Sequence, residues 1–164
     1  IPSIELDITK EIIGTDEAFE NLGLDPDGTY SFKLNFKALE PNENEEYVDI
    51  NAVISNKGTT VVKLPVGSYL ITEADDNYFD FVDIVSTMDP EIIVDGVTFE
   101  KTEQGYVITV TDDVEDDSFY TLKVTNEIEP ERHYEETDSE INLFNATPVV
   151  EEQSLFQKFF SLFE

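Results

Sequence analysis

The sequence of 164 residues contains no cysteine and only one histidine, His133. Without cysteine there is no disulfide framework, no thiol nucleophile and no thiolate metal site. A single histidine leaves almost no material for a histidine-based zinc site or a Ser-His-Asp triad. No run of apolar residues approaches the length that crosses a membrane. We therefore expect no cofactor, no bound metal and no membrane-spanning segment.

Positive charge is also scarce, with 9 Lys and Arg against 38 Asp and Glu and a formal net charge of -29. Contacts with phosphate need Lys and Arg, so this balance argues against binding to nucleic acid or to anionic membranes. The acidic residues gather at 40–46, 75–80 and 112–117, and none of these stretches has the ligand spacing of an EF-hand. Solvated acidic loops are favoured over calcium sites.

Short segments in which apolar and polar residues alternate run through the first 128 residues, as is typical of half-buried strands. Glu103-Gln104-Gly105 separates two of them and predicts a hairpin. A short helical turn is expected at 16–22. The expected extended segments lie at 4–12, 30–38, 47–54, 59–64, 69–73, 78–87, 92–94, 97–101, 106–110 and 119–128. Seven to nine strands with no long helix between them predict an all-β protein built as an antiparallel β-sandwich.

Composition changes after this region and predicts three parts. Residues 1–129 are expected to form the sandwich domain. Residues 130–150 are polar and acidic and are predicted to be a linker, in which 141–146 has the pattern of one more strand. Residues 151–164 repeat apolar side chains at helical spacing, which predicts a short C-terminal amphipathic helix. That helix would pack back on a domain or dock on a partner.

Three predicted strands carry a polar residue where the alternation points into the core. Lys10 falls in the apolar row of the first strand, Glu73 in that of the stretch "LPVGSYLITEAD", and Asn126 in that of the last strand. A buried and isolated lysine or glutamate is costly and is rarely tolerated without a partner. The simplest solution is that the three side chains meet.

Lysine, glutamate and asparagine together in an apolar pocket are capable of one specific reaction. Desolvation lowers the pKa of a lysine and raises that of a carboxyl group, which leaves a neutral amine and a proton-donating acid. The amine then attacks the amide carbon of asparagine, while the acid polarises the carbonyl and helps ammonia to leave. The product is a Lys–Asn isopeptide bond.

Each residue also has an ordinary interpretation. Lys10 would extend to solvent from a strand end. Asn126 would bond to backbone, and Glu73 would be exposed where its strand leaves the sheet.

These stretches resemble the Cna-B-type domains of Gram-positive surface proteins and pilins. The matching pieces are "ITKEI" with Lys10, "YSFKLNF", "LPVGSYLITEAD" with Glu73 and "YTLKVTNEI" with Asn126, in the order of that family over residues 4–128. The resemblance implies an immunoglobulin-like (reverse-Ig) sandwich. It also implies that Lys10 is bonded to Asn126, with Glu73 as the catalyst of that bond. The acidic surface and the long aromatic stretch at 75–95 depart from the family.

The resemblance further implies a structural stalk or pilin-type module of an extracellular surface protein or fibre. The expected location is the surface of a cell with a Gram-positive-type wall, and the expected partners are neighbouring domains or subunits. Because the isopeptide bond forms once per molecule, we do not expect an enzyme.

Two other classes of function stay open. The aromatic and acidic region 75–82 is the candidate surface of an adhesive module that recognises a carbohydrate, or a protein of a host. A pair of carboxylates would be the only material for an enzyme, as in glycosidases. The acids lie in loops without a cleft signature, so the structural module is favoured.

Overall fold

The computed structural model describes residues 1–128, and these form nine strands and one short helix. The elements are β1 (Ser3–Ile13), α1 (Asp16–Asn21), β2 (Ser31–Ala38), β3 (Ile50–Ser55), β4 (Thr60–Pro65), β5 (Gly67–Glu73), β6 (Phe79–Ser86), β7 (Val97–Thr102), β8 (Gly105–Val110) and β9 (Ser118–Ile128). The predicted all-β class is confirmed. The linker predicted at 130–150, the helix predicted at 151–164 and His133 lie outside the described residues.

The described residues divide into two compact units. The larger unit contains residues 1–13, 27–76 and 81–127, and it includes both sheets except for residues 79–80 of β6 and Ile128 of β9. The smaller unit contains residues 14–26, 77–80 and Ile128.

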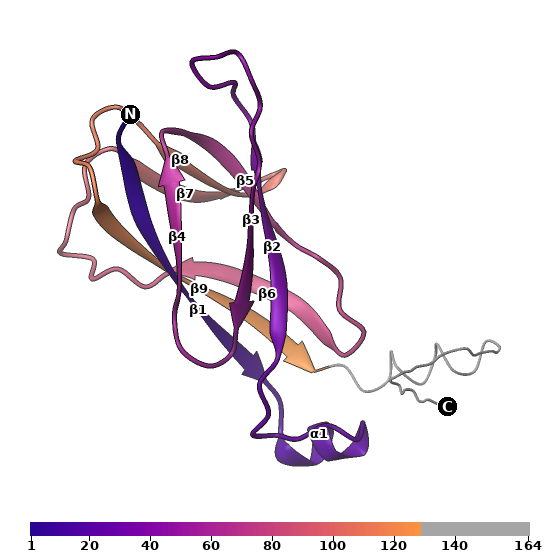
Figure 1. Cartoon of the computed structure of the whole chain (residues 1–164). Helices are drawn as coiled ribbons and strands as arrows, with labels where there is room; N and C mark the ends of the chain where they lie inside the picture. Colours follow the sequence, from indigo (N-terminus) through magenta and orange to yellow (C-terminus); the bar gives the residue numbers. More distant parts are fainter. Residues whose placement is uncertain (129–164) are drawn as a thin grey trace. The chain divides into compact units, whose positions relative to one another are not determined.

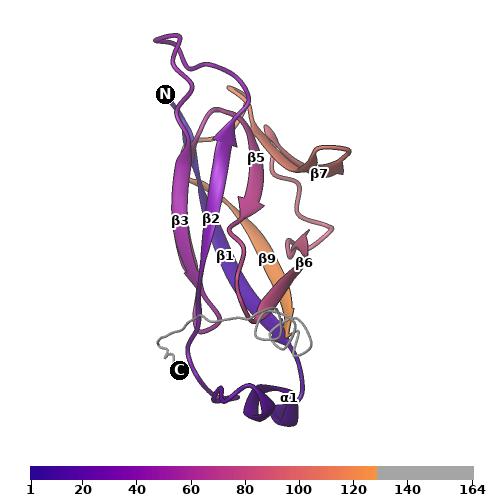
Figure 2. The same cartoon turned by 90° about the vertical axis from the view of Figure 1, so that its right-hand side faces the viewer.

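The larger unit is a sandwich of two sheets (Figure 1). One sheet has the order β4-β1-β9-β6, and the other has the order β3-β2-β5-β8-β7. Figure 2 shows β3, β2 and β5 of the second sheet side by side. The sandwich predicted from the alternation is confirmed, and the pairing of β1 with β4, of β2 with β3 and β5, and of β8 with β5 and β7 is antiparallel.

The first and last strands break the antiparallel pattern. β1 and β9 are parallel neighbours, with a register that runs from Ile4 opposite Ser118 to Ile13 opposite Glu127. Figure 1 shows the two arrows side by side and pointing the same way. A parallel pair needs a long connection, and the whole of the chain between the two strands supplies it.

The core follows the alternation of the strands. Along β1 the side chains of Ile4, Leu6 and Ile8 are buried, and the residues between them face outward. The same pattern holds in β2, where every second side chain is buried. The largest fully buried side chains are Phe36, Ile4, Leu6, Ile8, Leu34, Ile54, Leu64, Ile108 and Leu122. Both sheets therefore contribute to one apolar layer, as a sandwich requires.

The stretch "LPVGSY" carries the chain from one sheet to the other. β4 ends at Pro65 in the first sheet, and β5 begins at Gly67 in the second. The Tyr69 hydroxyl donates a hydrogen bond to the carbonyl oxygen of Pro65 at 3.0 Å. Gly67 has a positive φ of 153°, and a Cβ at this position would come within 3.0 Å of the Tyr69 hydroxyl. The glycine therefore lets the ring fold back over the crossing.

The smaller unit contains the predicted helical turn. Thr15 caps α1, because its side-chain oxygen accepts a hydrogen bond from the backbone N–H of Ala18 at 3.1 Å. Phe19 of this helix is buried and lies 5.9 Å from Phe79, centroid to centroid. Within residues 1–128 no helix has the length and apolar character needed to cross a membrane.

One predicted extended segment is wrong. Residues 92–94 lie in the connection between β6 and β7 and form no strand. Ile93 is 84% exposed there. The apolar run suggested a strand, but alternation is too short over three residues to specify one.

Candidate functional site

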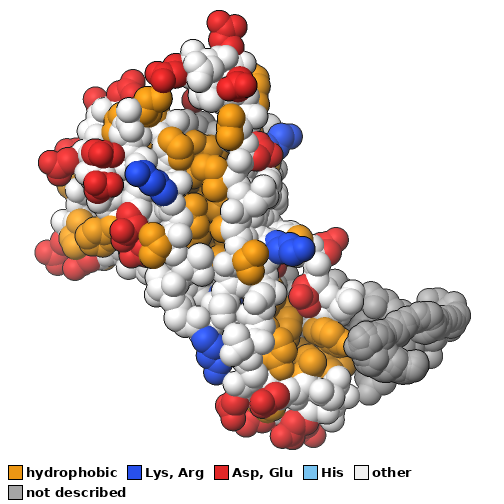
Figure 3. Space-filling view, in the orientation of Figure 1, with side chains coloured by type: hydrophobic (Ala, Val, Ile, Leu, Met, Phe, Trp, Pro, Cys, Tyr) orange, Lys and Arg blue, Asp and Glu red, His pale blue; other side chains and the backbone are white. Residues whose placement is uncertain are grey.

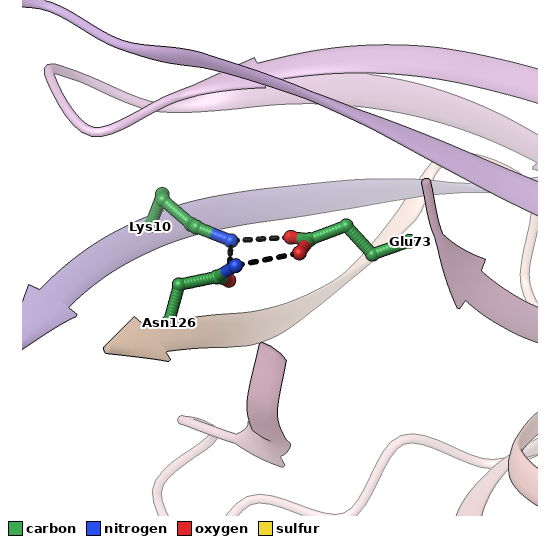
Figure 4. Close-up of polar contacts among 3 residues, drawn as sticks. All are labelled: Lys10, Glu73 and Asn126. Carbon is green, nitrogen blue, oxygen red and sulfur yellow. Dashed lines mark hydrogen bonds and ion pairs between the residues drawn. The ribbon is translucent and has the colours of Figure 1, made fainter. Parts of the chain in front are cut away.

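The three polar residues predicted to point inward meet inside the sandwich. Lys10 comes from β1 and Asn126 from β9, so these two belong to neighbouring strands of one sheet. Glu73 is the last residue of β5 and reaches them from the other sheet. Figure 4 shows the three side chains pointing toward one another.

The contacts among them form a closed triangle. The Lys10 Nζ donates to Oε2 of Glu73, with which it forms an ion pair, and to Oδ1 of Asn126. Nδ2 of Asn126 donates to Oε1 of Glu73 at 2.6 Å. Each carboxylate oxygen thus faces a different nitrogen, one on the amine and one on the amide (Figure 4).

The register of the parallel pair explains why the site needs a side chain as long as lysine. Lys10 stands opposite Val124, and Asn126 is two residues further along β9. At about 3.3 Å per residue this offset is roughly 7 Å, so the amine must pass Val124 to reach the amide. The four methylene groups of Lys10 span that offset along the inner face of the sheet.

Burial removes the site from water. Asn126 has 0% of its surface exposed, and the side chains of Lys10 and Glu73 are 0% and 2% exposed. A charge in such a place is tolerated only with a partner that satisfies it. The triangle supplies those partners for all three residues.

Burial lowers the pKa of the Lys10 amine below its usual range. The carboxylates of Glu73 and Asp76 act in the opposite direction, and burial has the larger effect. The Nζ also lies 3.9 Å from the centroid of the Phe32 ring. The amine is therefore held where loss of its proton is easier than in water.

The arrangement is suited to moving a proton from the amine to the amide. Oε2 of Glu73 accepts a hydrogen bond from Nζ of Lys10, the nitrogen that must lose a proton. Oε1 accepts one from Nδ2 of Asn126, the nitrogen that would leave as ammonia. The Asn126 carbonyl oxygen contacts Lys10 in this orientation of the amide. The contacts therefore favour a proton-shuttling role for Glu73, and polarisation of the carbonyl by Glu73 stays a prediction.

Sequence reasoning missed the two further groups around the amine, Phe32 and Asp76. The alternation of β2 correctly places Phe32 inward, where it is 3% exposed. Its meeting with Lys10 depends on how the two sheets are stacked, which no spacing in the sequence encodes. Asp76 follows β5 in a stretch whose acids were expected only to be solvated.

The other predicted surface, 75–82, has mixed character. Phe79 is buried in the smaller unit, against Phe19 and beside Tyr78. Phe81, in the larger unit, is 40% exposed and lies edge-on to Tyr106 at 5.8 Å. Part of this aromatic stretch therefore has a packing role.

The acidic loops show no gathered metal site. Residues 1–128 contain no group of three or more His, Cys, Asp or Glu side chains able to hold a metal ion. On the face drawn in Figure 3, acidic side chains occupy several separate places, with apolar side chains exposed between them.

No family model and no curated protein matches this chain. Among solved structures it is similar to an adhesin from Mobiluncus mulieris that contains intramolecular disulfide, isopeptide and ester bond cross-links. The identity is 15% and the TM-score 0.46, over 76% of this chain and 41% of the adhesin.

Two pilus proteins are among the other solved structures that the chain matches. A pilus-presented adhesin has 16% identity and a TM-score of 0.32, over 76% of this chain and 27% of its own. The major pilin from Streptococcus pyogenes has 18% identity and a TM-score of 0.27, over 77% and 48%. The chain spans less than half the length of each structure. Likeness at this level concerns the fold and not the chemistry.

Proposed function

We propose that Lys10 and Asn126 join in an intramolecular isopeptide bond, and that the domain is a structural module of an extracellular surface protein or fibre. The observation that carries the proposal is the closed and buried triangle of Lys10, Glu73 and Asn126. The order of the three motifs along the chain supports the same reading.

The reaction begins with a proton transfer. The Lys10 ammonium gives one proton to Oε2 of Glu73 and becomes a neutral amine, which burial favours. The amine nitrogen attacks Cγ of Asn126, and a C–N bond forms as the carbonyl π electrons move to Oδ1. The attacking nitrogen is still positively charged at this point, so it must lose a second proton.

Collapse of this intermediate releases ammonia. The carboxyl group of Glu73 donates its proton to Nδ2, which it already faces, and takes the second proton from the attacking nitrogen. The bond from Cγ to Nδ2 breaks, and its electrons leave with ammonia. Lys10 and Asn126 are left joined by an amide, and Glu73 holds the second proton. Ammonia takes this proton and leaves as ammonium, which returns Glu73 to the carboxylate. Atoms balance without any co-reactant.

The fold provides most of the acceleration. Two adjacent strands hold the amine and the amide side by side, which replaces a bimolecular encounter with an intramolecular one. The burial of the site excludes water, so hydrolysis does not compete. The reaction occurs once per molecule, and the chain is not a turnover enzyme.

The position of the bond suits a mechanical role. β1 and β9 are parallel, so the start of β1 and the end of β9 lie at opposite ends of the pair. Tension applied at these two ends would pass along β1 to Lys10, through the bond to Asn126, and along the last residues of β9. The residues from 11 to 125 would carry no load.

Such a module would hold a neighbouring domain or subunit away from the surface of a cell with a Gram-positive-type wall. An amide suits that setting because it is not broken by reduction, and the chain has no cysteine to form a disulfide. The bond would give a cysteine-free domain a covalent link between its first and last strands.

Stretching single molecules from both ends tests this function. The wild-type chain should give no extension from the residues enclosed by the bond. Glu73→Ala should release the chain between Lys10 and Asn126, which are 116 positions apart in the sequence, or roughly 400 Å at about 3.5 Å per residue. Lys33→Ala, which removes an exposed lysine of β2, should behave as the wild type. Release of the full length by the wild type would contradict the mechanical function.

A further inference from the structure

The Lys10 nitrogen has a third neighbour besides the two that take part in the proposed reaction. The centroid of the Phe32 ring lies 3.9 Å from Nζ, well within the range of a cation–π contact. Phe32 is 3% exposed, so the contact is shielded from water. Desolvated contacts of this kind are stronger than exposed ones.

The number of neighbours matches the number of N–H groups on the amine. A lysine ammonium has three N–H donors and no acceptor. Glu73, Asn126 and the face of the Phe32 ring are three partners for them. In the proposed reaction Asn126 is a reactant and Glu73 carries protons, whereas the Phe32 ring neither reacts nor carries a proton.

The second sheet places Phe32 and Glu73 together on one side of the amine. Glu73 stands opposite Leu34 of β2, and Phe32 is two residues from Leu34 on the same inward face. The ring and the carboxylate therefore reach Lys10 from neighbouring strands. Asn126 approaches from the sheet that carries Lys10 itself.

We propose that Phe32 is a positioning residue for the cross-linking reaction, which rests on the function proposed above. The ring holds the charged amine over its face, so that Nζ is already in place when a proton passes to Glu73. The nitrogen then stays beside Cγ of Asn126 and does not withdraw along its flexible side chain. A side chain with four methylene groups needs such a restraint, because a misplacement of about 1 Å costs roughly a hundredfold in rate.

The ring also has an electrostatic effect that packing alone would not produce. Its negative face favours the ammonium over the neutral amine. The other charged groups that face this amine are the carboxylates of Glu73 and Asp76, and both favour the ammonium as well. Replacing the ring with an alkyl side chain of similar burial should lower the pKa of Lys10 further, with both carboxylates still in place.

The first test measures this pKa in a chain that cannot react. In an Asn126→Ala background, the Lys10 side chain is titrated by NMR with and without Phe32→Leu. The cation–π range predicts that Phe32→Leu lowers the pKa by about half a unit to one and a half units. Phe36→Leu is the matched control, since Phe36 is a fully buried residue of the same strand, and it should leave the pKa unchanged.

The second test measures the reaction itself. Full-length chains kept unfolded in urea are diluted into buffer, and the loss of one ammonia is followed by mass. Phe32→Leu should slow this loss roughly tenfold or more, and Phe36→Leu much less. Fluorinated phenylalanines at position 32 keep the ring but weaken its negative face, and the rate should fall as fluorine atoms are added.

The outcomes separate the two proposals. A wild-type chain that keeps its full mass overturns the cross-linking function, whatever the ring does. A wild-type chain that loses ammonia, with Phe32→Leu and Phe36→Leu alike in both pKa and rate, overturns only the role of Phe32. In that case the ring merely fills space.

Discussion

A lysine–glutamate pair lies on each face of the two neighbouring strands β1 and β9, in very different surroundings, and on the inner face the glutamate comes from β5 of the other sheet. On the inner face, Lys10 contacts Glu73 with both side chains almost fully buried. On the outer face, Nζ of Lys123 lies 3.1 Å from Oε1 of Glu11, with side chains that are 38% and 54% exposed. The same two residue types thus form one buried pair, between β1 and β5, and one exposed pair, between β1 and β9.

In the proposed reaction, this difference makes burial, and not pairing alone, the source of the reactivity. Water screens the outer pair, and exposed pairs of this kind contribute about 0–1 kcal/mol. The inner pair is shielded from water, and burial disfavours charged groups. The surroundings therefore favour transfer of a proton from the amine to the carboxylate. The inner pair also contacts the side-chain amide of Asn126, which is buried beside it.

The largest expected effect is the complete loss of the cross-link from the inner face. Asn126→Ala removes the amide carbon that the amine attacks. Peptide mapping of the digested wild type should show a branched peptide joining the segments around Lys10 and Asn126, and the variant should show none. Asn51→Ala, which removes an exposed asparagine of β3, is the matched control and should keep the branched peptide. A branched peptide in Asn126→Ala would contradict the assignment.

The second largest effect is expected on the free energy of unfolding, and only for a substitution on the inner face. Glu73→Gln should prevent the bond and lower the free energy of unfolding by about 4–5 kcal/mol, by analogy with a disulfide closing a loop of similar length. Urea titration measures the change. Glu11→Gln makes the same substitution in the outer pair and should cost at most about 1 kcal/mol. Equal losses would remove the distinction between the two faces.

The reaction rate should depend on pH in a way that only a buried pair explains. In the proposed reaction Lys10 and Glu73 share one proton, so the rate of ammonia loss should be bell-shaped. At low pH a second proton keeps the amine charged, and at high pH the carboxyl group has no proton to give. Because burial lowers the pKa of Lys10, the high-pH limb should lie below the usual range of lysine. Refolding from urea at a series of pH values measures the profile, and a rate that rises steadily through that range would contradict a shared proton.

The smallest effect is expected from the outer pair. Lys123→Ala should lower the free energy of unfolding by less than about 1 kcal/mol, and the loss should shrink further in high salt. Urea titration at low and high salt checks both statements. A large loss that salt does not reduce would mean that the outer pair is part of the stabilising core.

The inner site could be predicted from the sequence because strands have a strict period of two. Lys10, Glu73 and Asn126 each interrupt an apolar row, and the structure buries all three as that period requires. Their meeting followed from the cost of burying each one alone. The resemblance to a known domain added the order of the motifs.

Features that depend on the strand order within a sheet or on the stacking of the two sheets could not be predicted. The parallel pairing of β1 with β9 fixes the two-residue offset between Lys10 and Asn126. The alternation gives a face for each residue but no strand order. The contact between Phe32 and Lys10 also crosses from one sheet to the other. Both are long-range properties that local spacing does not contain.

The intact mass of the purified and denatured protein, measured beside Glu73→Ala, tests the central claim most directly. If the inner face carries out the reaction, the wild type is lighter than its sequence by the mass of one ammonia, and Glu73→Ala has the full mass of its own sequence. A wild type with the full sequence mass would contradict the claim and would leave Lys10 and Glu73 as a buried ion pair.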